Sequence, residues 1–260
     1  MEQPPPISEI QSVPPKPPPM SLMARLINVF AGPGEVFEDI KASPPAVPNW
    51  LLPALLFAVM GIISSFVMFS QPAIVQKIHE EQAKKIDEMV KSGKLSRADA
   101  DKAEAMAEKF TGPPMLKIFG SVGAVIASFV RLLWWALILW LLGKVLKRPF
   151  GYGKALEVIG LASMITVLGS IVTILLIVNL GRMIATPSLA LTISDFDVTR
   201  KSHLMLGTIN FFYFWQIGVL SVGLAKLAGV SFVRAMPLVL ICWVLQELLL
   251  IFSGMGQFAL

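Results

Sequence analysis

Two charged residues within long apolar stretches are the positions of this sequence at which chemistry is most plausible. Arg131 lies near the middle of one stretch and Glu247 near the middle of another. A charged side chain at the centre of a bilayer costs about 2.5–3.5 kcal/mol on insertion scales, so it needs a partner. The opposite signs predict that the two residues pair inside a helix bundle, with Gln246, Asn210 or Gln216 completing their hydrogen bonds. The first interpretation is a structural pair that fixes helix register, and the alternative is proton coupling or binding of a charged ligand.

Motifs for catalysis or metal binding are almost absent from the sequence. The single cysteine, Cys242, excludes an intramolecular disulfide or a thiolate cluster, and two histidines, His79 and His203, argue against a zinc or iron site. Gly151-Tyr-Gly153 begins like a dinucleotide-binding loop, but Leu156 replaces its third glycine. No phosphate-binding loop, zinc-protease motif or nucleophile elbow occurs. We therefore expect no enzyme, no cofactor and no metal.

Composition places the chain in a membrane. Its 260 residues are 55% apolar and 15% charged, against about 25% charged in globular domains, and its mean hydropathy is +0.71. A helix needs about 20 apolar residues to cross roughly 30 Å of hydrocarbon. Five stretches meet that length and predict an all-α, polytopic membrane protein with a five-transmembrane-helix bundle: 50–70, 118–143, 156–180, 204–225 and 235–256.

The positions of lysine and arginine predict how the chain crosses the bilayer. Basic residues with few acidic neighbours occur in the N-terminal segment and in the second and fourth loops between spans, whereas the C-terminal tail has none. The long first loop has nine basic residues between Lys77 and Lys117, but eight acidic residues accompany them, and long loops translocate with less regard to charge. This distribution favours a cytoplasmic N-terminus and an outside C-terminus in a cell membrane. Loops that face anionic lipid account for the net charge of +5. The lipid bilayer is therefore an expected partner, and nucleic acid is not.

Three segments lie outside the predicted spans. Residues 1–20 are rich in proline and predict a disordered tail. Residues 72–114 predict a helical hairpin, because apolar side chains recur at helical spacing on either side of Gly93. Its two apolar stripes either bury each other or face a partner. Residues 21–48 predict amphipathic helices. Their apolar face either contacts the membrane interface or a partner, or packs on the bundle as a cap. The side chains expected to make the interfacial or partner contact are Leu26, Phe30, Phe37 and Ile40.

Three stretches, taken in order, resemble one family of membrane proteins. They are residues 26–41 (LINVFAGPGEVFEDIK), residues 150–162 (FGYGKALEVIGLA) and residues 211–225 (FFYFWQIGVLSVGLA). Together they are similar to the Yip-one domain family, the Ypt/Rab-interacting family of five-span proteins. The resemblance runs from residue 22 to residue 253. It implies a five-helix bundle with a cytoplasmic N-terminus, and the family supplies no catalytic residues to transfer.

The resemblance also implies a class of function. The long segment at 72–114 and the proline-rich start look more like bacterial members, which implies a bacterial inner membrane and argues against contact with small GTPases. Some bacterial relatives look like companions of ABC-type efflux systems. We therefore expect a non-enzymatic scaffold or accessory factor for another membrane protein, with self-association as an alternative.

Two other classes of function stay open on the sequence. The rival to a scaffold is a transporter of a small solute, a proton or a lipid that uses Arg131 and Glu247. The absence of an inverted repeat, and of a marked interruption within the predicted spans, argues against that rival. The third class is an envelope sensor that reads signals through the hairpin at 72–114.

Overall fold

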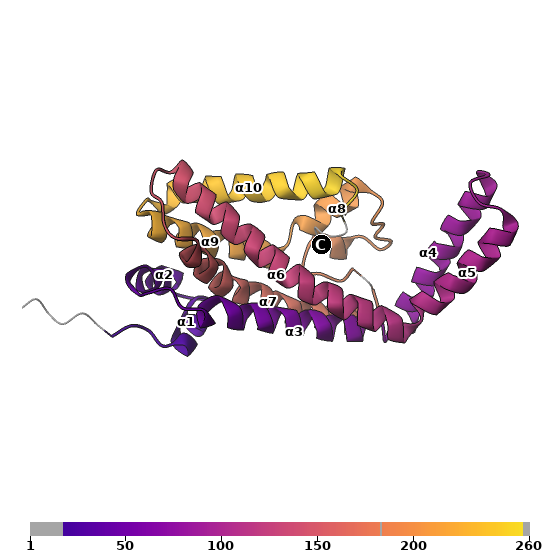
Figure 1. Ribbon diagram of the computed structural model, residues 1–260, viewed down its shortest axis with the longest axis horizontal. Coiled ribbons are helices and arrows are strands. Elements are labelled where there is room, and N and C mark those ends of the chain that lie inside the picture. The colour runs from indigo at the N-terminus through magenta and orange to yellow at the C-terminus, as the bar shows by residue number, and fades with distance from the viewer. Residues whose placement is uncertain (1–17, 183, 257–260) are drawn as a thin grey trace, which may run out of the picture.

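Helices make up the protein, and five of them form its long body (Figure 1). The computed structural model describes residues 18–182 and 184–256, so most of the predicted proline-rich tail lies outside the described residues. Five described helices are long and apolar enough to cross a membrane, which confirms the predicted all-α polytopic fold class. They are α3 (Pro48–Met68), α6 (Pro113–Val145), α7 (Tyr152–Leu180), α9 (Phe211–Ala228) and α10 (Phe232–Phe252).

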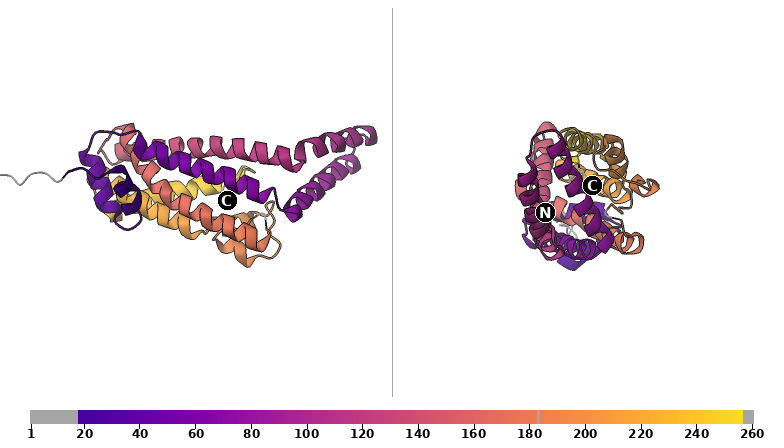
Figure 2. Two further views of the ribbon diagram at one scale, coloured as in Figure 1. Left: turned by 90° about the horizontal axis from the view of Figure 1, so that it is seen from below. Right: turned by 90° about the vertical axis from the view of Figure 1, so that its right-hand side faces the viewer.

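The connections divide between the two ends of the bundle. One end carries α1 (Leu22–Asn28), α2 (Pro33–Ala42) and the short turns that join α6 to α7 and α9 to α10 (Figures 1 and 2). The other end carries the hairpin of α4 (Pro72–Lys91) and α5 (Arg97–Thr111), together with the segment from 181 to 210. Within that segment lie η1 (Leu189–Thr192) and α8 (Lys201–Thr208).

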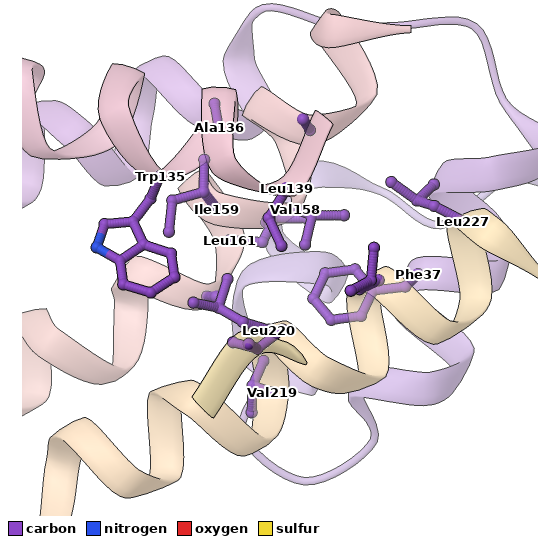
Figure 3. Close-up of a cluster of buried hydrophobic side chains, with 14 of the residues drawn as sticks. Phe37, Trp135, Ala136, Leu139, Val158, Ile159, Leu161, Val219, Leu220 and Leu227 are labelled. Carbon is purple, nitrogen blue, oxygen red and sulfur yellow. The ribbon is translucent and has the colours of Figure 1, made fainter. Parts of the chain in front are cut away.

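The amphipathic segment caps the bundle. Ser21 begins α1 by accepting a hydrogen bond from the Ala24 amide, and Pro33 occupies the first turn of α2. Phe37 is fully buried, and Figure 3 shows its ring beside Val158 of α7 and Leu220 of α9. The apolar face of this segment therefore contributes to the protein core.

This burial corrects the contact role expected for Leu26, Phe37 and Ile40, whereas Phe30, the fourth side chain expected to make contacts, is only partly buried. Leu26 is 5% exposed, Phe37 and Ile40 are not exposed at all, and Phe30 packs edge-on against Trp215 with 6.0 Å between ring centroids. A side chain enclosed by the bundle cannot also touch lipid or a partner. The exposed large apolar side chains on this segment are instead Met23, Ile27 and Val47. Of the two interpretations of residues 21–48, the cap is the one that the packing supports.

Helices α7 and α9 are the most buried of the spans, and both pack against their neighbours through small residues. A Cβ atom added to Gly160 of α7 would lie 2.3 Å from the Cα of Trp50 in α3, so only glycine allows this approach. On α9, Gly223 leaves room for Val158, because a Cβ there would lie 2.3 Å from the Val158 Cγ1. Close contacts of this kind provide the dispersion attraction that associates helices in a membrane.

The α4–α5 hairpin extends beyond the helix bundle (Figures 1 and 2). Gly93 has a φ of 71° in the turn, and Ser96 caps α5 by accepting a hydrogen bond from the Asp99 amide at 3.1 Å. Ile86 and Ala100 are buried within the hairpin. At its base, the carbonyl of Thr111 lies 3.1 Å from the His79 ring nitrogen, which joins its two ends.

The fourth span differs from the sequence prediction, which started it at residue 204. The chain breaks between α8 and α9, because Asn210 is extended (φ −119°, ψ 131°) and pairs with Ser188 in an isolated β-bridge. The Asn210 side chain then caps α9 by accepting a hydrogen bond from the Phe212 amide at 2.9 Å. An apolar run cannot reveal such a break, because the break depends on backbone pairing with a distant loop.

Candidate functional site: a polar cavity beside Arg131

Arg131 lies on a polar cavity inside the helix bundle. The cavity has a volume of about 200 Å³, and it lies between α3, α6, α7, the start of α9 and the loop at 186–187. Its polar lining comes from all of these elements: Ser64, Arg131, Thr166, Ser170, Thr173, Thr186, Asn210 and Tyr213. The apolar part includes Phe57, Met60 and Phe212. The charge predicted to face the bundle interior is thus placed beside hydroxyl groups from the three spans α3, α7 and α9, the hydroxyl of Thr186 and the side-chain amide of Asn210.

The Arg131 guanidinium has an aromatic neighbour. Its central carbon lies 5.3 Å from the centre of the Tyr213 ring, a cation–π distance. Among the described residues, no acidic side chain lies within 4.0 Å of it as an ion-pair partner. A cation–π contact alone leaves the five N–H donors of a guanidinium unmatched by acceptors.

Glu247 lies inside the bundle on α10 but makes no direct pair with Arg131. It is 7% exposed, and its carboxylate accepts a long hydrogen bond of 3.4 Å from Gln246. Its Oε2 atom is buried with no hydrogen-bond partner among the described residues. The two charges predicted from the sequence therefore do not form an ion pair within 4.0 Å.

The polar residues expected around the pair have separate positions. Gln216 and Trp243 line a narrow gap that also borders Arg131, and Asn210 lies on the main cavity. Gln246 instead accepts a hydrogen bond from the Trp134 indole at 2.7 Å, at an exposed position. Asn210 and Gln216 thus accompany Arg131, whereas Gln246 accompanies Glu247.

A second polar centre, which the sequence analysis missed, joins the cap to the bundle. Glu157 of α7 is fully buried, and its Oε1 atom accepts hydrogen bonds from the Asn49 side chain at 2.6 Å and the Ala46 amide at 3.0 Å. Its Oε2 atom forms an ion pair with Lys154 at 2.8 Å. Lys154 also donates to the carbonyls at the end of α2 and just beyond it, those of Ile40 and Ser43.

The same centre extends to α1 through a buried arginine. Arg25 is 7% exposed and forms an ion pair with Asp39 of α2 at 2.8 Å. Its Nη1 atom also donates to the Asn49 side chain at 3.1 Å. One signal in the sequence pointed here: Glu157 is an acidic residue just inside a predicted span, three positions after a lysine. The role of the centre is structural, because its charged groups form ion pairs with one another, Arg25 with Asp39 and Lys154 with Glu157.

Comparison with known proteins identifies the family of the chain. No curated protein and no solved structure matches the chain. The family model of the Yip1 domain matches residues 27–255, which confirms the resemblance noted from the sequence. Because the match includes all of α2 and all five apolar helices, the chain belongs to the Yip1 domain family.

Proposed function

We propose that this membrane protein is a non-enzymatic scaffold or accessory factor for another membrane complex, and that the α4–α5 hairpin contacts the partner. Support comes from the shape of the hairpin, which extends beyond the bundle (Figure 2). Its apolar side chains only partly bury one another: Met89, Met106 and Phe110 are 40%, 63% and 46% exposed. Exposed apolar side chains on a projecting element are typical of a protein contact.

The protein's membrane and its orientation across the bilayer are part of the proposed function. We place the protein in the cell membrane of a bacterium, with α1, α2 and the basic turns in the cytoplasm and the hairpin outside. The turns at the end that carries the cap hold exposed basic residues and no acidic ones, among them Lys144, Lys147, Arg148 and Arg234, whereas residues 77–117 at the other end balance nine basic residues with eight acidic ones. This clustering agrees with the preference of cytoplasmic loops for lysine and arginine. A component of an ABC-type efflux system is our candidate partner, and a second copy of this chain is the alternative.

Purification of the full chain in mild detergent, followed by mass spectrometry, tests the hairpin as a contact element. The informative variant replaces Met106 and Phe110 with serine, and the matched control replaces exposed Lys102 with serine. A stoichiometric partner that is retained by the wild type and the Lys102 control, and lost from the double variant, supports the proposal. A partner that stays on the double variant, or no partner on the wild type, contradicts it.

A second candidate function, the handling of a small polar ligand or a lipid, is favoured by one observation. Arg131 and Asn210 lie on a cavity of about 200 Å³. A role as a scaffold does not require such a cavity, whereas the binding of a ligand does. The interruption between α8 and α9 removes one argument against a transport or binding role, because ligand sites in membrane proteins often form where helices are discontinuous. Retention of a ligand by the purified chain would separate this role from the scaffold role.

A further inference from the structure

We propose that the cavity beside Arg131 binds a phosphate group, carried either by an anionic lipid or by a small solute. This inference rests on the second candidate function and is independent of the scaffold role. It specifies the chemistry of the ligand from three properties of the cavity: its charge, its unused hydrogen-bond donors and its size.

The charge of the cavity favours an anion. Arg131 is positive, and none of the described residues that line the cavity is acidic. Glu247 is not part of the lining. The N-terminus of α9, an 18-residue helix capped by Asn210, opens on the same space and adds the positive end of a helix dipole. Apolar walls strengthen these attractions because they lower the local dielectric constant.

Several side chains on the cavity have hydrogen-bond donors with no acceptor among the described residues. Asn210 is 5% exposed; its side-chain oxygen is used by the α9 cap, whereas its Nδ2 group donates to no described residue. The hydroxyls of Ser64 and Thr173 also line the cavity, and neither makes a hydrogen bond within the described part of the chain. With the Arg131 guanidinium, donors from α3, α6, α7 and the α9 cap thus converge on one space.

The number and arrangement of these donors suit a phosphate better than a smaller anion. Free phosphate offers four acceptor oxygens and a lipid phosphodiester two charged and two ester oxygens, whereas a carboxylate offers two, and a guanidinium binds phosphate through two parallel N–H bonds. The cavity volume of about 200 Å³ exceeds several-fold the roughly 30 Å³ that one water takes in the liquid. A chloride ion would leave most of that space unfilled. The same site accommodates a lipid headgroup or a free phosphate.

Thermal unfolding of the full chain in dodecyl maltoside, which contains no phosphate, tests the proposal. One arm titrates inorganic phosphate against sodium chloride of equal ionic strength. The other adds phosphatidylglycerol to the micelles, and native mass spectrometry then measures the retained lipid. We expect the unfolding midpoint to rise in at least one arm, because a ligand that binds only the folded state stabilises it. A rise only with phosphate identifies a solute, and a rise only with the lipid identifies a headgroup.

Three variants locate the binding. Arg131→Gln removes the charge, and Asn210→Asp keeps an oxygen for the α9 cap while placing a negative charge on the cavity. Each is expected to weaken binding about 10-fold or more, the first because a charged hydrogen bond is lost and the second because the new carboxylate repels the phosphate. Exposed Arg148, in the turn between α6 and α7, provides the control Arg148→Gln, which should bind like the wild type.

Several outcomes would overturn the phosphate site. They are a wild-type midpoint that moves in neither arm, Asn210→Asp binding as tightly as the wild type, and Arg148→Gln weakening the binding as much as the cavity variants. Because Asn210→Asp retains the helix cap, the proposal stays testable even if Arg131→Gln does not fold. The partner assay on the hairpin reports separately on the scaffold role, so the two proposals can fail independently.

Discussion

Replacing Glu157 with glutamine removes one charge from the buried centre that joins the cap to the bundle. The substitution keeps the shape of the side chain and an oxygen that can accept from Asn49. It deprives Lys154, whose side chain is 13% exposed, of its ion-pair partner at 2.8 Å. An amide NH2 group that faces a buried ammonium adds a donor where an acceptor is needed.

The burial of the pair sets the expected magnitude. Removing one partner of a buried ion pair costs about 3–5 kcal/mol, because the remaining charge is left uncompensated. Lys154 retains two carbonyl acceptors, at 2.6 and 2.7 Å, so we expect a loss near the lower limit of that range. The pair of Lys91 and Asp87 provides the contrast, since both of its side chains are more than half exposed. Such a surface pair contributes about 0–1 kcal/mol.

Equilibrium unfolding in detergent measures the free energy of unfolding of Glu157→Gln and of the matched control Asp87→Asn. Hydrogen exchange of peptides from α2 reports in parallel whether the cap loosens, because Lys154 holds the carbonyls of Ile40 and Ser43. The double variant Glu157→Gln with Lys154→Met should be less destabilised than the sum of the single variants. If Glu157→Gln unfolds within 1 kcal/mol of the control and α2 keeps its protection, the inference that this centre holds the cap is refuted.

Two further predictions concern helix packing and pH. Gly160→Ala should destabilise the protein by about 1–3 kcal/mol or more, because the new Cβ would lie 2.3 Å from the Cα of Trp50. The control Gly123→Ala places a Cβ that meets nothing within 4 Å, so it should be neutral or stabilising by up to about 1 kcal/mol. Thermal unfolding of the two variants measures the difference. Hydrogen bonds from the Thr199 side chain and amide lower the pKa of Asp197. The turn at 197–199 should therefore persist below the usual pKa of an aspartate and be lost as the pH falls through the lowered pKa. Thr199→Val should raise the pKa of Asp197 in a carboxyl NMR titration, and an unchanged pKa would contradict this cause.

The sequence alone determined the class of the protein. Apolar runs of about 20 residues predict membrane helices because hydrocarbon leaves no other partner for the backbone. The predicted spans therefore overlap the five apolar helices, and the family resemblance matches the family model. Arg131 and Glu247 stood out for the same reason, since charges are rare in such runs.

The tertiary structure decided which polar residues lie together. Glu157 and Asn49 are 108 positions apart, and Arg131 and Asn210 reach one cavity from different helices. The burial of Phe37 under α7 and α9, and the break at Asn210, likewise depend on contacts with distant segments. Periodicity and composition describe how each segment interacts with solvent or lipid, whereas pairing between segments depends on how whole helices pack against one another. For that reason the membrane class could be predicted from single residues and short runs, while the polar centre and the cavity required the folded bundle.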